Sequence, residues 1–287
     1  MPPLHSDITT RLASISDTPA LDASVLIAHV INKPRTWVMA HPEITLTTGQ
    51  QKNLDDSLAR LESGESFPYV LGHWEFFGLD MYVTPDVLIP RPETELLVEK
   101  AIVWLQESSA RSPSITLRVA DVGTGSGAIA VSLAVNMPDV EVLATDISPK
   151  ALQVAKRNAE KFSVSNKIEF TECDLLPNKS TIVNRHLPFD LICANLPYIP
   201  TKTLRQLPIF GREPTITLDG GEDGLDLIRR LLNITPDWLS PNALILLETE
   251  ATLGNQVRKI ASDLFAQAEI HLHRDLTGRD RLLEIRL

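Results

Sequence analysis

The sequence contains little cysteine, few aromatic residues and no long apolar run. Its 287 residues include only two cysteines, Cys173 and Cys193, whose separation matches no metal-ligand spacing, so we expect reduced thiols and no metal site. The longest apolar stretch, residues 25–31, is far shorter than the roughly 20 residues that span a membrane. The N-terminus lacks the basic start and apolar core of a signal peptide. These absences predict a cytoplasmic protein without a membrane segment.

An excess of positive charge is also absent. The formal net charge is -10, which argues against a protein that holds nucleic acid mainly through phosphate contacts. Hydrophobic residues make up 43% of the chain and charged residues 22%, as in ordinary globular proteins. The length suits one large domain or two smaller ones. We therefore expect a globular protein for which nucleic acid is an unlikely partner.

The first 72 residues show helical periodicity. Apolar residues at helical spacing cover residues 21–31 and stop at Pro34, and a second stripe covers residues 50–61 and stops at Gly64. No glycine-rich loop or cluster of catalytic residue types occurs here, so we predict a helical substrate-docking domain over residues 1–72. Residues 73–90 are aromatic and β-branched around Gly78, which predicts a β-hairpin linker.

From residue 91 the pattern changes to alternating strands and helices. Strands are predicted over residues 117–121, 141–146, 167–173, 189–194, 243–248, 269–275 and 281–287, and helices over residues 126–136, 149–162, 225–239 and 253–268. Such alternation predicts an α/β domain over residues 91–287, with a mostly parallel seven-stranded sheet covered on both faces. The two closing strands, joined at Gly278, predict an antiparallel strand at or near one edge.

A glycine-rich loop, residues 121–128, joins the first of these strands to its helix. Its three glycines let the backbone turn tightly and approach a ligand closely. Asp146 and Asp174 end the next two strands, so they are expected at the same rim as Asp121. The loop also satisfies the looser dinucleotide fingerprint through Gly123, Gly125 and Ala128, which is a weak match.

Charge favours one of the two cofactor classes that this loop suits. A dinucleotide would bring a pyrophosphate close to Asp121, which has the same sign of charge. S-adenosylmethionine has no phosphate and carries a sulfonium and an amino group, both of which a carboxylate attracts. The three aspartates therefore favour S-adenosyl-L-methionine over a nicotinamide dinucleotide.

The end of the strand over residues 189–194 carries the most informative side chains. Asn195 offers a donor and an acceptor, and Pro197 restricts Leu196 to an extended conformation that fixes its carbonyl. In open α/β sheets, ligands bind beyond the carboxyl ends of strands. Two acceptors and the ring of Tyr198 suit a planar group with an NH2, such as an amide or an exocyclic amine. Asn and Pro are also common in ordinary turns.

The glycine loop and the segment Asn195–Tyr198 resemble those of class I, Rossmann-like methyltransferases that depend on S-adenosylmethionine and methylate amide or exocyclic nitrogens. The order of segments is most similar to the HemK/PrmC family of release factor glutamine N5-methyltransferases. The shared segments are a helical N-terminal domain, residues 75–79, 88–95, 213–214 and 219–225, the glycine loop and the tetrapeptide. The resemblance covers nearly the whole chain, and residues 88–95 and 219–225 are its most specific parts.

The resemblance implies methyl transfer from S-adenosyl-L-methionine to the side-chain amide nitrogen of a glutamine, that of the GGQ motif of peptide chain release factors. S-adenosyl-L-homocysteine would be the product. Asn195 and Tyr198 are the predicted catalytic residues, and Asn195, Leu196, Pro197 and Tyr198 the predicted substrate contacts. The predicted cofactor contacts are Asp121, Val122, Gly123, Thr124, Gly125, Gly127, Asp146, Asp174, Leu175 and Asn195. The family has proline where this chain has Leu196, so we expect activity to survive with a looser pocket.

Three other functions remain open at this point. An adenine N6-methyltransferase uses a similar tetrapeptide, although the acidic charge and the helical domain count against it. A non-catalytic cofactor-binding protein and a nicotinamide oxidoreductase would each keep the loop and differ in the reaction. Among single residues, His271 and His273 are interpreted as surface histidines and Glu248 and Glu250 as solvated carboxylates, while Arg91 suits a ligand contact or a structural role equally well.

Overall fold

The computed structural model describes residues 4–112, 115–177 and 188–287. The chain divides into two compact units, Met1–His73 and Trp74–Leu287. The first unit contains, within the described residues, five helices: α1 (Leu4–Leu12), α2 (Pro19–Ile31), α3 (Arg35–Ala40), α4 (Thr48–Glu62) and α5 (Phe67–Leu71). The two helical stripes of the sequence thus correspond to α2 and α4, each slightly longer than predicted.

Local signals explain where the helices of the first unit begin and end. The hydroxyl of Thr47 accepts the amide of Gln50, whose side chain accepts the amide of Thr47 in return, so α4 starts with a capping box. Helix α2 ends at Asn32, which adopts a left-handed conformation with φ of 53°. Ile8, Leu26 and Leu54 are among the buried apolar residues that pack these helices together.

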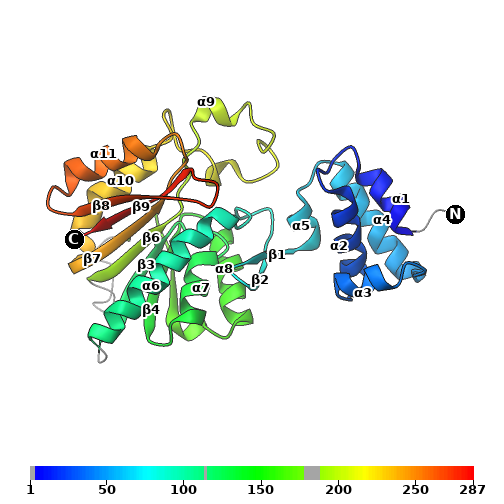
Figure 1. The fold of residues 1–287 in the computed structure, drawn as a ribbon, viewed down its shortest axis with the longest axis horizontal. Coiled ribbons are helices and arrows are strands. Elements are labelled where there is room, and N and C mark those ends of the chain that lie inside the picture. Colours follow the sequence, from blue (N-terminus) through cyan, green and yellow to red (C-terminus); the bar gives the residue numbers. More distant parts are fainter. Residues whose placement is uncertain (1–3, 113–114, 178–187) are drawn as a thin grey trace. The chain divides into compact units, whose positions relative to one another are not determined.

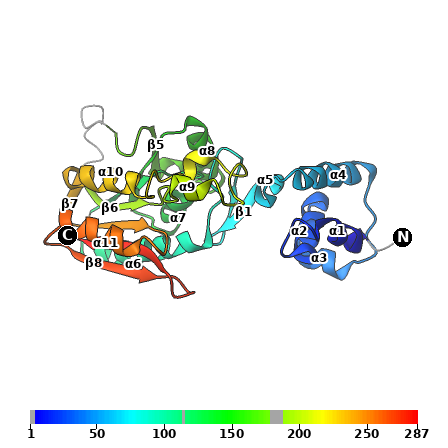
Figure 2. The ribbon, with the colours of Figure 1, turned by 90° about the horizontal axis from the view of Figure 1, so that it is seen from above.

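A mixed seven-stranded sheet forms the centre of the second unit. Its strands are β3 (Leu117–Val122), β4 (Val140–Asp146), β5 (Ile168–Glu172), β6 (Phe189–Ala194), β7 (Leu239–Glu248), β8 (Glu269–Arg274) and β9 (Asp280–Arg286). Their order is β5-β4-β3-β6-β7-β9-β8, and only β9 runs opposite to the others. Figure 2 shows β5 and β8 at opposite edges of this sheet. The predicted mostly parallel sheet with a reversed strand near one edge is confirmed.

Helices cover both faces of the sheet (Figure 1). They are α6 (Glu95–Arg111), α7 (Ala128–Asn136), α8 (Pro149–Lys161), α10 (Asp226–Ile234) and α11 (Gly254–Leu264), with a short α9 (Thr201–Leu204) in the connection after β6. Two hydrophobic cores lie on the two faces of the sheet, and alternate side chains of β3 belong to one or the other. Val119 packs in the core with α6 and α7, and Ala120 packs in the core with α10 and α11. The central strands are therefore apolar on both faces, as buried parallel strands require. Among the helices within the described ranges, none is long and apolar enough to cross a membrane.

Several element boundaries differ from those predicted: β7 begins four residues earlier and α11 ends four residues earlier, and two further differences have a local cause. The helix expected over residues 225–239 ends at Ile234 and continues as a 3₁₀ turn, Thr235–Trp238, because Pro236 lacks an amide hydrogen and its ring would clash with the preceding turn. The helix expected from residue 126 begins only at Ala128, since Gly127 adopts a left-handed conformation with φ of 81°. The aromatic segment after residue 72 forms β1 (His73–Phe76) and β2 (Leu79–Tyr82), which pair as a two-stranded sheet.

The strand order reverses between β3 and β6. In their parallel register Asp121 lies opposite Cys193 and Val122 opposite Ala194. The next residues of the two strands, Gly123 and Asn195, therefore leave the sheet side by side. Ligands of open α/β sheets bind in the crevice at such a reversal.

Candidate active site

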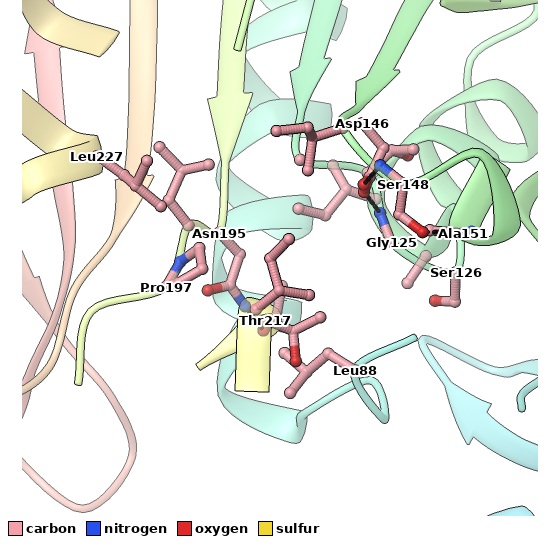
Figure 3. Close-up of a pocket in the computed structure, with 18 of the residues that line it drawn as sticks. Leu88, Gly125, Ser126, Asp146, Ser148, Ala151, Asn195, Pro197, Thr217 and Leu227 are labelled. Carbon is pink, nitrogen blue, oxygen red and sulfur yellow. Dashed lines mark hydrogen bonds between the residues drawn. The ribbon is translucent and has the colours of Figure 1, made fainter. Parts of the chain in front are cut away.

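A pocket of about 230 Å³ lies beyond the carboxyl ends of β3, β4, β5 and β6. This volume exceeds the roughly 30 Å³ share of one water molecule several times, so the pocket can hold an organic ligand. Nine predicted site residues line it: Gly123, Thr124, Gly125, Asp146, Asp174, Leu175, Asn195, Leu196 and Pro197. Figure 3 shows Asn195 and Pro197 on one side of the pocket, and Gly125 and Asp146 on the other.

The glycine loop is held in place by backbone contacts and by Asp146. The amides of Gly123 and Thr124 donate to the carbonyl of Thr145 at 2.9 and 2.8 Å. One oxygen of Asp146 accepts the amide of Gly125 at 2.9 Å, and the other accepts the amide of Ser148 at 2.8 Å (Figure 3). Burial raises the pKa of Asp146, and these backbone donors oppose that effect. One carboxylate thus joins the loop after β3 to the start of α8.

Gly127 and Gly125 provide a matched test of how the loop is packed. Both have positive φ, 81° and 56°, so alanine at either position costs about 1–2 kcal/mol of backbone strain. A Cβ on Gly127 would lie 3.0 Å from the Cβ of Ala155, whereas a Cβ on Gly125 meets nothing within 4 Å. We expect Gly127→Ala to lower the free energy of unfolding by about 1–3 kcal/mol more than Gly125→Ala, through overpacking. Urea unfolding of both variants measures this difference. Equal losses of stability would show that α8 shifts away from the new methyl group without a loss of free energy.

Asp121 lies beneath the glycine loop, whereas we predicted it on the same rim as Asp146 and Asp174. It is fully buried, and its Oδ2 accepts the hydroxyl of Thr124 at 2.6 Å and the amide of Ala130 at 3.1 Å. Within the described residues its Oδ1 has no hydrogen-bond partner. Burial raises the pKa of Asp121 to about 6. The carboxylate therefore fixes the loop to the start of α7. Val122, Gly127 and Tyr198 do not line the pocket either.

The opposite end of the pocket contains Leu175 and Asp174. Leu175 is buried and has a positive φ of 64°, a conformation that costs a non-glycine residue roughly 1–2 kcal/mol. The hydroxyl of Thr145 donates to its carbonyl at 2.6 Å and holds it there. Such local strain often marks a functional position. Asp174 is half exposed and pairs with Arg230 at 2.5 Å, so the two side chains form a polar rim.

Asn195 is held by residues far away in the sequence. Its Nδ2 donates to the hydroxyl of Thr94 at 2.9 Å, and that hydroxyl donates to Oε2 of Glu248 at 2.6 Å. The hydroxyl of Tyr198 donates to the other oxygen of Glu248 at 3.2 Å. Leu196 is buried, and its Cδ2 lies against Gly123. The leucine side chain thus fills space beside the glycine loop.

The interpretation of Glu248 as a solvated carboxylate is wrong. Glu248 is 2% exposed, because it ends β7 in the interior, where Thr94 and Tyr198 contact it. Burial raises its pKa to about 7, against the opposing effects of these hydrogen bonds and of Arg281. Burial also raises the pKa of Tyr198, so its hydroxyl stays protonated and donates.

Arg91 connects two of the segments that carry the resemblance, residues 88–95 and residues 213–214. Its guanidinium pairs with Glu213 at 2.5 Å, and the second oxygen of Glu213 accepts the amide of Ile89 at 3.2 Å. Glu213 is buried, whereas Arg91 lines the pocket. Arg91 therefore has a structural role, which was one of its two interpretations: through Glu213 it holds two loops together at the wall of the pocket.

Sequence reasoning missed several lining residues. Thr94 was included only as a member of the shared segment over residues 88–95, although it is buried and lies at the pocket wall. The apolar wall was not predicted at all, and it includes Phe76, Leu88, Ile129, Ile147, Ile216 and Leu227. The signal that could have indicated Thr94 is its place in residues 88–95, one of the segments that carry the resemblance.

No described part of the chain gathers three or more His, Cys, Asp or Glu side chains as a metal site would. His273 pairs with Glu284 at 2.9 Å on the neighbouring strand, and His271 is exposed. Both cysteines are free thiols; Cys193 is buried in β6, and Cys173 follows β5 at the pocket.

A mostly parallel seven-stranded sheet, with a glycine loop after one central strand and a polar tip after the next, defines a Rossmann-like methyltransferase. A family described as a methyltransferase domain matches residues 114–267, and one described as the PrmC N-terminal domain matches residues 4–72. The T. thermophilus 16S rRNA methyltransferase RsmC, solved with AdoMet and guanosine, has the same fold. Its TM-score is 0.51 at 17% identity, over 75% of this chain and 49% of that one.

Similarity over the whole length identifies the particular family. The release factor glutamine methyltransferase of Coxiella burnetii is 37% identical over 98% of this chain and 96% of its own length. The one from Moorella thermoacetica is 39% identical over 92% of this chain and 90% of its own length. The chain belongs to the release factor glutamine methyltransferase family.

Proposed function

We propose that this protein transfers a methyl group from S-adenosyl-L-methionine to the side-chain amide nitrogen of a glutamine in a peptide chain release factor. One observation carries the proposal. The NH2 group of Asn195 donates to the hydroxyl of Thr94, so the side-chain oxygen of Asn195 remains available to accept a hydrogen bond. Asn195 lines the same pocket as the glycine loop. An acceptor in that position suits a substrate amide, whose nitrogen carries two hydrogens to donate.

The residues present fit the cofactor. Asp146 ends β4 with a half-buried carboxylate at the pocket, suited to the hydroxyls of a ribose. Leu175 and Ile147 provide apolar surface for a purine ring, and Gly123 and Gly125 let the backbone approach the rest of the molecule. When bound, S-adenosylmethionine supplies a methyl group made electrophilic by its positively charged sulfur.

The protein's part in the reaction is to bind and orient a poor nucleophile. The nitrogen lone pair of a glutamine amide is delocalised into the carbonyl, so reaction requires good alignment. The oxygen of Asn195 and the carbonyl of Leu196 would accept the two N–H groups and stabilise positive charge as it develops on the nitrogen. Tyr198, predicted to pack on the amide plane, does not line the pocket and would instead support Asn195 indirectly, through its hydrogen bond to Glu248. Proximity of this kind contributes roughly 7–11 kcal/mol, and the proton leaves to water after transfer.

We assign docking of the release factor to the helical domain, residues 1–72, which connects through the hairpin linker, residues 73–90, to the catalytic domain, residues 91–287. Both cysteines are free thiols, which is usual in a reducing compartment, so we place the reaction in the cytoplasm.

Incubating the protein with S-adenosylmethionine and purified release factor tests the proposal. We expect mass spectrometry to find one added methyl group on a single glutamine, and a release factor with that glutamine replaced by asparagine to remain unmodified. A nucleic acid substrate in a parallel reaction should gain no methyl group. Methylation of adenine without methylation of release factor would contradict the proposal.

A further inference from the structure

A line of hydrogen-bonded side chains leads from the pocket into the interior. Asn195 donates to Thr94, Thr94 donates to Glu248, and Tyr198 donates to the second oxygen of Glu248. Thr94 is 4% exposed and Glu248 is 2% exposed, so water does not compete for these groups. The three residues that follow Asn195 in this line come from three separate segments, namely the turn before α6, the end of β7 and the loop after β6.

The donors and acceptors of this line allow only one arrangement while Glu248 is charged. A carboxylate has no hydrogen to donate, so Thr94 must give its single hydroxyl proton to Glu248. Thr94 is then only an acceptor towards Asn195, and the Asn195 side chain must turn its NH2 group towards it. Its carbonyl oxygen is left for the pocket. With the amide reversed, two oxygen acceptors would face each other without a proton between them.

We propose that Thr94 and Glu248 are positioning residues that hold the Asn195 amide with its oxygen towards the pocket. The inference rests on the proposed function, because only a substrate that donates hydrogens requires an acceptor there. It also defines a selectivity: the pocket accepts a planar NH2 group and rejects a carboxylate or a carbonyl in the same place. A substrate glutamate would bring oxygen against oxygen.

The charge on Glu248 links this arrangement to pH. The groups that face it are Tyr198 and Thr94, which donate to it, Arg281 on β9, which favours its charged form, and Glu93, which opposes it. Its pKa of about 7 lies well above that of an ordinary glutamate. Below pH 7 a protonated Glu248 donates to Thr94, the Thr94 hydroxyl is free to turn towards Asn195, and the constraint on the amide is lost. Methyl transfer at saturating substrate should therefore fall as the pH drops through about 7.

Three threonine variants test the positioning role in turnover. Thr94→Val keeps the side-chain shape and removes the hydroxyl, and we expect kcat to fall roughly ten- to a hundredfold with little change in cofactor affinity. Thr94→Ser restores the hydroxyl and should recover most of the activity and the wild-type pH profile, whereas the profile of Thr94→Val should be flat near pH 7. Thr235→Val is the control, because Thr235 is also buried and its hydroxyl donates to the carbonyl of Leu231 in the preceding helix, α10, away from the pocket. Equal activity of wild type and Thr94→Val, or no recovery in Thr94→Ser, would overturn the proposal.

A measurement without turnover separates this inference from the proposed function. In protein carrying ¹⁵N-asparagine, the side-chain NH2 signal of Asn195 is identified by its loss in Asn195→Ala. We expect one of its two hydrogens to exchange slowly with solvent in wild type and in Thr94→Ser, and quickly in Thr94→Val. Fast exchange in all three proteins would overturn the inference even if release factor is methylated. Slow exchange that depends on Thr94, in a protein that methylates no release factor, would support the inference and reject the proposed substrate.

Discussion

Replacing Asn195 by alanine is expected to abolish nearly all methyl transfer while S-adenosylmethionine still binds. The variant removes the oxygen that accepts the substrate N–H, and loss of one aimed dipole in an active site costs about 10²–10³ in kcat. The glycine loop should be unaffected, because the hydrogen bonds that hold it are to Thr145, Asp146 and Asp121 and not to Asn195. Single-turnover methylation at saturating release factor measures the loss, and titration with S-adenosylhomocysteine measures the retained affinity.

Asn136→Ala provides the control for this prediction. Asn136 ends α7, and its Nδ2 donates to the carbonyl of Ser132 in the same helix at 2.8 Å, so the substitution removes an amide side chain outside the pocket. We expect its activity to match that of wild type. Near-normal turnover by Asn195→Ala would remove the basis of the proposed mechanism, since no other side-chain amide lines the pocket within the described residues.

The position of Asn195 opposite the glycine loop was predictable from sequence for a simple reason. Alternating strands and helices predict parallel strands, and parallel strands deliver their carboxyl ends to one edge. The short apolar runs over residues 117–121 and 189–194 both end in polar or glycine residues, which fixed the edge where chemistry was expected. The structure places these strands next to each other, with Asp121 opposite Cys193.

The surroundings of the carboxylates were not predictable in the same way. Asp121, Asp146 and Asp174 all end or follow strands, and their sequence positions are equivalent. Burial separates them: Asp121 is covered by its own loop, Asp146 binds two backbone amides, and Asp174 reaches solvent and Arg230. The pairing of Thr94 with Glu248 joins residues 154 positions apart, so it depends on how the turn before α6 packs against β7. No local pattern carries that information.

Asp146 is the aspartate whose replacement should weaken cofactor binding most. We expect Asp146→Ala to weaken S-adenosylmethionine binding by roughly ten- to a hundredfold, because a hydrogen bond to a charged group contributes about 1.5–3 kcal/mol. The substitution also releases the amides of Gly125 and Ser148, which the carboxylate holds. Because burial raises the pKa of Asp146, the affinity of wild type should also fall as the pH is lowered and the carboxylate is protonated.

Asp174→Ala is the matched control for Asp146→Ala, since both aspartates line the pocket and both were predicted to contact the cofactor. The Asp174 side chain is 51% exposed and paired with an equally exposed Arg230, so solvent screens its charge and its loss should change affinity little. Isothermal titration with S-adenosylmethionine compares the two variants, and urea unfolding shows whether each is folded. Asp146→Asn, which preserves the side-chain volume, replaces Asp146→Ala if the latter unfolds. A larger loss for Asp174→Ala than for either Asp146 variant would place the ribose at β5, and Asp146 would then have only the role of holding the loop.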